Sequence, residues 1–247
     1  MMFMPLISGL CALLPAAVLV TLQLLIQPVG VLQYLFYAAA IFFFTTISTF
    51  FSVALAHGAM GRMNGEDPTI GGCVAAARQN IPSILKWALF ATGVGLALRF
   101  IEEKLGGLAG LLTRFIGDAA FAAASFFVVP MLTHSEVGPI EALKASSALI
   151  ARHWRKAIRV NLRFGLYAIG IVLAALALCG VGAVLTAVIG PVGLVVAFAG
   201  VLSLVYAVLY LNALSIYAKC AMYRYAYGMA TPGFSTQAMQ AAVKQRK

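Results

Sequence analysis

Residues 164–188, FGLYAIGIVLAALALCGVGAVLTAV, decide the fold class of this chain. They contain no Lys, Arg, Asp or Glu, and they exceed the roughly 18 apolar residues that mark a membrane-spanning helix. A second stretch of the same kind covers residues 192–218, after a predicted turn at Gly190-Pro191. Two long uncharged segments joined by a tight turn predict a helical hairpin that crosses a membrane twice.

The rest of the chain has the same apolar character. Of its 247 residues, 63% are hydrophobic and 10% are charged, and the mean hydropathy is +0.99. Soluble domains carry about 25% charged residues. We therefore expect an all-α polytopic membrane protein, with a single six-helix transmembrane domain over residues 1–230 and a cytoplasmic tail over residues 231–247. The six predicted spans are residues 3–25, 31–60, 84–101, 115–132, 164–188 and 192–218.

The basic residues predict how the spans are oriented. Of the 17 Lys and Arg, all except Arg99, Lys104 and Arg114 fall in segments that face one side under this plan. Cytoplasmic loops carry the excess of Lys and Arg, so we expect both termini in the cytoplasm. The net charge of +10 is then explained by orientation and by anionic lipid headgroups. Nucleic acid is not needed as a partner.

Polar segments with a proline follow the second, fourth and sixth spans, at residues 66–70, 136–140 and 230–234. After the first two segments, the pattern predicts short amphipathic helices over residues 70–80 and 140–152. The plan is three hairpins, with these two helices as cytoplasmic elbows between them. If a span is broken, we expect the break at Pro130 or at the glycine-rich outer end of residues 164–188.

Three motifs carry a resemblance to a known family. They are residues 216–228, IYAKCAMYRYAYG, with Pro232-Gly233-Phe234 after them, residues 126–130, FFVVP, and residues 138–146, GPIEALKAS. Together they resemble an uncharacterised family of prokaryotic six-span membrane proteins, and the likeness extends over nearly the whole chain. The resemblance implies the six-span architecture and a prokaryotic inner membrane. It implies no activity, because these motifs concern packing and elbows.

A basic cluster on the second elbow is the most distinctive charged feature. Its spacing places the charges along one face of a continuous helix, and a tryptophan among them suits the depth of the headgroups. The cluster either binds anionic lipid headgroups or serves only to fix the orientation of the spans. The cluster consists of Arg152, Trp154, Arg155, Lys156, Arg159 and Arg163.

A polar stripe on the second span offers a different interpretation. Thr45, Ser48, Thr49 and Ser52 repeat at helical spacing and could line a transport path, with Asp118 or Asn212 contributing from other spans. Hydroxyl groups in a membrane helix also bond to neighbouring helices or to their own backbone. Asp118 has an ion-pair partner at helical spacing in Arg114, with Arg99 as the alternative partner. Packing and transport therefore both stay open.

Catalysis and metal binding are not expected. The seven acidic residues are few and scattered, and the three histidines form no arrangement with a nucleophile. The four cysteines have no spacing typical of a metal or redox site, so we expect no cofactor. The leading hypothesis is a non-enzymatic accessory or scaffold protein that contacts anionic lipid or a protein partner at its cytoplasmic face. The alternative is a transporter or channel for a small solute or ion.

Overall fold

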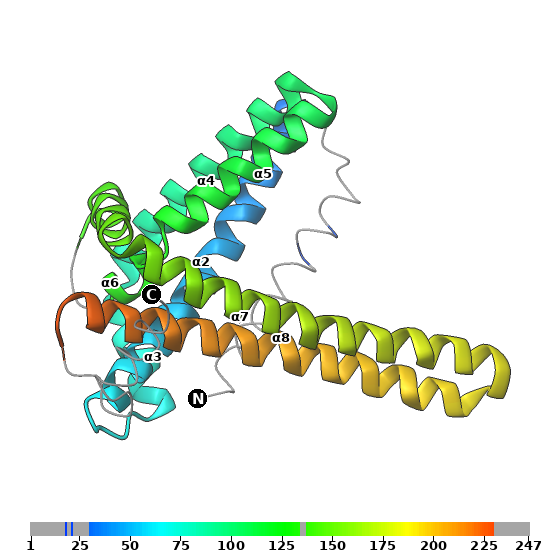
Figure 1. The fold of residues 1–247 in the computed structure, drawn as a ribbon. Helices are drawn as coiled ribbons and strands as arrows, with labels where there is room; N and C mark the ends of the chain where they lie inside the picture. Colours follow the sequence, from blue (N-terminus) through cyan, green and yellow to red (C-terminus); the bar gives the residue numbers. More distant parts are fainter. Residues whose placement is uncertain (1–17, 19–20, 22–29, 134–136, 230–247) are drawn as a thin grey trace. The chain divides into compact units, whose positions relative to one another are not determined.

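The computed structural model describes residues 18 and 21, 30–133 and 137–229, and gives the backbone alone for residues 152–167, 187–189 and 191–192. The predicted tail, and the predicted first span apart from residues 18 and 21, lie outside these residues. Every regular element in the described part is an α-helix (Figure 1). The all-α prediction is confirmed for that part of the chain.

Among the described residues, five helical segments are long and apolar enough to cross a membrane. Each of the five predicted spans from residue 31 onward overlaps one of them. The five segments are Val31–Met63, Ile81–Leu105, Gly107–Met131, Ala168–Thr186 and Gly193–Ala226.

The chain forms two compact units. The first comprises the described residues of Phe3–Arg152 and Ile216–Lys247, and the second is His153–Ser215. The first unit contains α2 (Val31–Met63), α3 (Ile70–Gln79), α4 (Ile81–Leu105), α5 (Gly107–Ala124) and α6 (Val128–Met131). Two long helices belong to both units, α7 (Pro139–Ile189) and α8 (Pro191–Ala226).

The second half of α2 lies in the core of the first unit. It packs against α3, α4 and α6, and Val53, Ala54, Ala56 and Ala59 are fully buried. Small side chains let neighbouring helices approach closely, which explains why this half of α2 accommodates three partners. The separate short helix α3 occupies the range in which the sequence predicts the first elbow.

α4 and α5 form a tight hairpin (Figure 1). Gly106 and Gly107 both have positive φ angles, which glycine adopts without steric cost. Further along, the rings of Trp87 and Phe121 stack at 5.9 Å. α5 begins at Gly107, eight residues before the predicted start of the fourth span at residue 115. Arg114 pairs with acidic side chains, so its charge does not interrupt the helix.

The fourth apolar segment is broken next to Pro130, one of the two predicted places. α5 ends at Ala124 and α6 begins at Val128. A proline ring clashes with the carbonyl four residues earlier, and here that carbonyl belongs to Phe126. Pro130 itself lies in the first turn of α6, where its missing N–H leaves no helical hydrogen bond unmade.

The second predicted elbow, residues 140–152, is not a separate helix, because it forms the beginning of α7. No proline or glycine lies between Pro139 and Gly165, so nothing in the sequence stops the backbone where the composition changes from polar to apolar. The predicted break at the outer end of residues 164–188 is also absent, because α7 is continuous to Ile189.

The glycines near that end instead bring α7 and α8 together within the second unit. A Cβ atom at Gly182 would collide with the backbone of Ala197, and one at Gly193 with the backbone of Thr186. A Cβ atom at Gly200 would lie 2.7 Å from the backbone nitrogen of Cys179. The two helices therefore touch backbone to backbone, as small residues allow in membranes.

These contacts predict opposite effects for two alanine substitutions in the same hairpin. Gly200→Ala should destabilise the protein by about 1–3 kcal/mol, because the added methyl group pushes the helices apart. Gly180→Ala has open space around its Cβ position and should be neutral or stabilising by up to about 1 kcal/mol. Thermal unfolding in detergent micelles compares the two variants. Equal unfolding temperatures would contradict the close contact.

Candidate functional site

The three family-like motifs meet in the first unit, around the break between α5 and α6. The backbone N–H of Phe127 donates a hydrogen bond to the hydroxyl of Ser146 on α7, at 3.0 Å. Both residues are almost completely buried, with 1% of Phe127 and none of Ser146 exposed. Since the break deprives this N–H of its helical acceptor, Ser146 supplies the missing partner.

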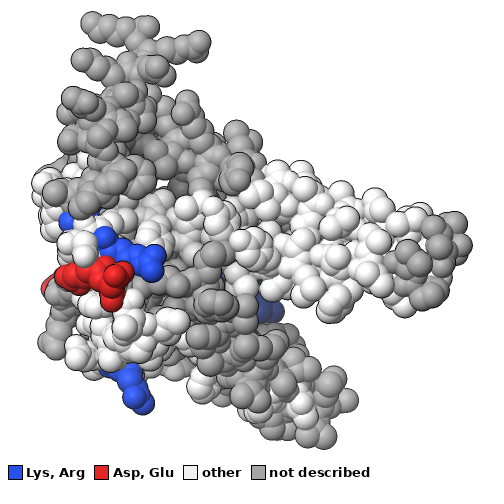
Figure 2. Space-filling model, turned by 90° about the horizontal axis from the view of Figure 1, so that it is seen from below, with Lys and Arg blue, Asp and Glu red and all other residues white. Residues whose placement is uncertain are grey.

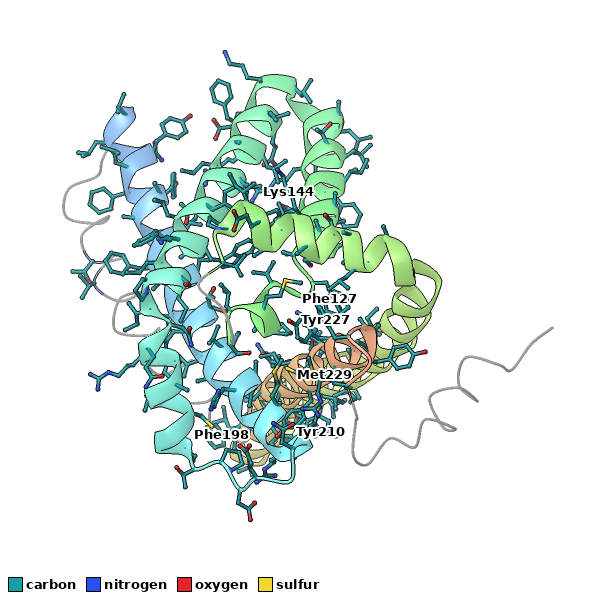
Figure 3. All side chains as sticks on the ribbon, turned by 90° about the vertical axis from the view of Figure 1, so that its left-hand side faces the viewer. Phe127, Lys144, Phe198, Tyr210, Tyr227 and Met229 are labelled. Atoms are coloured by element: carbon teal, nitrogen blue, oxygen red, sulfur yellow. The ribbon has the colours of Figure 1, made fainter. Side chains whose placement is uncertain are left out.

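Aromatic rings from α8 complete the same cluster. The ring of Tyr223 lies 6.3 Å from that of Phe127 and 4.8 Å from that of Tyr227. Phe127 and Tyr227 are labelled in Figure 3. The ammonium group of Lys219 lies 5.4 Å from the ring of Phe126, within the range of a cation–π contact. We call Phe126, Phe127, Ser146, Lys219 and Tyr223 the α6 cluster.

Two further contacts tie the end of α8 to α2. The guanidinium group of Arg224, which is 8% exposed, donates a hydrogen bond to the side-chain oxygen of Asn64, the residue that caps α2. The thiol of Cys220 lies 3.9 Å from the carbonyl oxygen of Ala56. The first unit is therefore closed by contacts between residues about 160 positions apart in sequence.

The residues of the predicted polar stripe differ in their burial. Thr49 is buried and Ser48 is exposed, while Thr45 and Ser52 are half-buried. Thr46, beside the stripe, donates to the carbonyl of Phe42 in its own helix, at 2.7 Å. Asn212 belongs to the second unit.

Asp118 belongs to a group of charged residues on the α4–α5 hairpin. Its carboxylate lies 3.4 Å from Arg114, which confirms the pair predicted from their spacing. Arg114 also contacts Glu102 at 2.6 Å. α5 packs on α4, and α4 packs on α2, so Asp118 lies on a helix that is not one of the main packing partners of α2.

A neighbouring pair of contacts joins α4 to the beginning of α2. Glu103 accepts a hydrogen bond from the hydroxyl of Tyr34, at 2.7 Å, and lies 3.3 Å from Arg99. Arg99 in turn lies 4.2 Å from the centre of the Tyr37 ring. Arg99 and Arg114 therefore each have an acidic partner, and their charges are locally neutralised.

The side chains of the predicted lipid-binding cluster lie outside the described residues. This applies to Arg152, Trp154, Arg155, Lys156, Arg159 and Arg163, whose backbone belongs to α7. The structure therefore shows that these residues belong to one continuous helix, and it does not describe their side chains. Among the described residues, no group of three or more His, Cys, Asp and Glu is placed to hold a metal ion.

Ser146 is the site residue that the sequence alone did not identify. Its motif was recognised, but its role depends on a contact with a residue 19 positions earlier. The proline at position 130 was the available signal, because a broken helix needs an outside acceptor or donor for its free backbone groups.

Ser146→Ala should destabilise the protein by about 1–3 kcal/mol, since it leaves the buried N–H of Phe127 without an acceptor. Ser147→Ala is the matched control, because Ser147 is exposed and its hydroxyl bonds only to the carbonyl of Lys144 in its own helix. Thermal unfolding in detergent measures both. If Ser147→Ala lowers the unfolding temperature as much as Ser146→Ala does, the buried hydrogen bond does not stabilise the protein more than the exposed one.

The buried thiol of Cys73 on α3 gives a pH-dependent prediction. Burial raises the pKa of Cys73, so the folded protein keeps the thiol protonated at pH values where an unfolded thiol, with a pKa of about 8.5, has ionised. This contribution to stability is present below pH 8.5 and declines as the pH rises above it.

A variant with Cys73 as its only cysteine should therefore resist maleimide until it unfolds. A second variant that carries its only cysteine at the exposed position 79 of the same helix, Gln79→Cys, is the control and should react quickly. Equal rates for the two variants would contradict the burial of Cys73.

Comparison with known proteins identifies the family of this chain. No curated protein and no solved structure matches the chain. The model of a family of unknown function, DUF6159, matches residues 26–234. That range includes all described helices and the three motifs, so the chain belongs to the DUF6159 family.

Proposed function

We propose that this chain is a non-enzymatic, multi-pass membrane protein that acts as an accessory or scaffold component. Its cytoplasmic face, formed by α3, the beginning of α7 and the tail, contacts anionic lipid or a protein partner. Six spans, with both termini in the cytoplasm of a prokaryotic cell, complete the proposal.

The observation that carries the proposal is the closed packing of the α6 cluster. The helix break beside Pro130 exposes a backbone N–H, and Ser146 satisfies it within the protein. Among the described residues, every buried side-chain nitrogen and oxygen has a hydrogen-bond partner. A site for chemistry or solute binding needs polar groups that are free to meet a ligand, whereas here they stabilise the fold.

The distribution of charge supports contact with lipid. Residues 164–218 contain no Lys, Arg, Asp or Glu, and the described atoms of this hairpin are correspondingly white in Figure 2. Arg155, Lys156, Arg159 and Arg163 lie immediately before it. Basic residues beside an apolar span attract anionic headgroups by about 1 kcal/mol each.

Transport is the second candidate function, and one observation favours it. Transporters often bind their substrates at discontinuous membrane helices, and α5 and α6 form such a helix. The backbone group freed by this break is already bonded to Ser146, so substrate binding there would require that bond to open. For this reason we place the scaffold function first.

The test of the proposal is reversal of charge in the basic cluster. Arg155→Glu with Lys156→Glu should reduce the phosphatidylglycerol that co-purifies with the full-length protein, because two attractive charges become repulsive. Mass spectrometry of the lipid extract measures the change, and membrane fractionation verifies that the variant still inserts.

The control reverses two basic residues elsewhere, Arg78→Glu with Lys144→Glu, both of which are exposed. It alters the net charge by the same amount and should leave the bound phosphatidylglycerol largely unchanged. If the first variant keeps both its insertion and its bound lipid, the lipid-contact function is wrong.

A further inference from the structure

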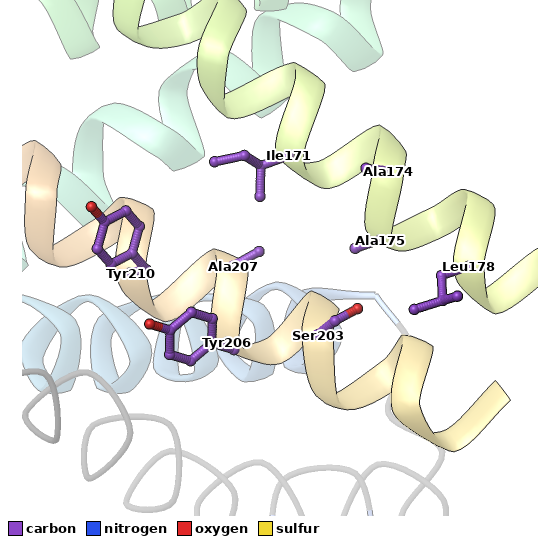
Figure 4. A pocket seen from close by; sticks show the side chains of 8 residues that line it. All are labelled: Ile171, Ala174, Ala175, Leu178, Ser203, Tyr206, Ala207 and Tyr210. Atoms are coloured by element: carbon purple, nitrogen blue, oxygen red, sulfur yellow. The ribbon is translucent and has the colours of Figure 1, made fainter. Parts of the chain in front are cut away.

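An open groove of about 500 Å³ runs between α7 and α8 within the second unit. Figure 4 shows its walls, with Ile171, Ala174, Ala175 and Leu178 on α7 facing residues of α8. The wall from α8 consists of Ser203, Tyr206, Ala207 and Tyr210. The groove is mainly apolar, and the hydroxyl of Ser203 donates to the carbonyl of Gly200 in its own helix.

The groove exists because α7 and α8 touch through their backbones in one part of the hairpin and face each other with side chains in the other part. Between the turn and Cys179, the glycines at positions 182, 193 and 200 keep the two backbones in contact. Farther from the turn, from Leu178 back to Ile171, the facing positions hold side chains. Here alanines lie opposite a pair of tyrosines. The rings of Tyr206 and Tyr210 stack at 6.2 Å and 13°, so they form a flat wall beside a floor of small residues.

The groove lies in the middle of a membrane span. The uncharged stretch of α7 begins at Phe164, and residues 171–178 lie about 10 to 21 Å beyond it at 1.5 Å per residue. Half of the hydrocarbon core of a bilayer measures about 15 Å. The near end of the groove is therefore within reach of an acyl chain whose headgroup lies at the start of this stretch.

The charge on the same helix identifies which lipid and which leaflet. Arg155, Lys156, Arg159 and Arg163 precede the groove along the continuous helix α7, and Arg163 lies about 12 Å along the axis from Ile171. A lipid whose chain follows the groove therefore has its headgroup at the level of these basic residues. We infer that the α7–α8 groove binds an acyl chain of an anionic phospholipid whose headgroup contacts this basic stretch.

This inference rests on the proposed contact with anionic lipid and deepens it, because it adds a site for the chain. Headgroup attraction alone would hold any anionic lipid loosely at the surface. A groove that receives the chain fixes the lipid in one position and buries apolar surface of the protein against it. The lipid would then behave as a bound component of the protein.

The test uses the full-length protein in phosphatidylcholine vesicles that contain a trace of phosphatidylglycerol with a photoreactive diazirine on its acyl chain. After irradiation, mass spectrometry should find the label mainly on residues 171–178 and 203–210. Phosphatidylcholine with the same diazirine chain should label these residues less. Arg155→Glu with Lys156→Glu should reduce the labelling by phosphatidylglycerol up to about 30-fold, since each basic residue attracts the headgroup by about 1 kcal/mol.

Two matched variants test the groove itself. Ala174→Phe fills the groove and should abolish most of the labelling, whereas Ala177→Phe adds the same side chain at an exposed position of α7 outside the groove and should preserve it. Circular dichroism verifies that both variants keep their helices. Label spread evenly over the exposed faces, equal labelling by the two lipids, or an equal loss in both variants would overturn the inference.

The two proposals can fail separately. If charge reversal leaves the co-purified phosphatidylglycerol unchanged, the headgroup contact fails, whatever the diazirine label shows. If charge reversal removes that lipid but Ala174→Phe does not change the labelling, the headgroup contact stands and the groove is wrong.

Discussion

The first unit depends on one hydrogen bond, from the backbone N–H of Phe127 to the hydroxyl of Ser146. Pro130 makes this bond necessary, because its ring prevents α5 from continuing as a regular helix. In an apolar interior a free N–H would cost about 1–3 kcal/mol. The acceptor comes from α7, so the start of that helix is fixed beside α6. The aromatic residues of α8 then pack against the same point. The three motifs are thus parts of one packing unit, and none of them resembles a catalytic motif.

Glycine determines the second unit in a comparable way. Gly182, Gly193 and Gly200 allow backbone contact between α7 and α8, and the groove begins where this contact ends. Close packing and an open groove therefore arise within one hairpin from the distribution of a few small residues. Aliphatic side chains at these three positions would separate the helices along their whole length and leave no defined boundary to the groove.

The sequence predicted the helices better than the positions where one helix ends and the next begins. Five of the predicted spans overlap helices that are long and apolar enough to cross a membrane, because long uncharged runs have few other uses. The start of α5 was missed because Arg114 resembles a loop residue until its partners, Glu102 and Asp118, are known. The second elbow was predicted as a separate helix, although a change from polar to apolar composition does not interrupt a backbone without glycine or proline.

For the candidate site, Pro130 indicated a break, but the role of Ser146 depends on a contact between two helices. The groove could not be predicted at all, because it reflects the spacing of glycines on two helices that face each other.

The basic residues of this protein fall into two groups that differ in whether acidic residues lie near them in the sequence. On the α4–α5 hairpin, Arg99 and Arg114 each meet a carboxylate, and ion pairing makes basic residues compatible with an apolar segment. On α7, five basic residues from Arg152 to Arg163 occur with no acidic residue between Glu141 and the end of the chain. No acid in that part of the sequence can neutralise them locally, so their counter-charge has to come from elsewhere in the chain or from the membrane. Phospholipid headgroups supply such a charge at the depth where α7 enters its apolar segment. The excess of basic residues that orients the chain and the proposed lipid site are, on this argument, two consequences of the same cluster.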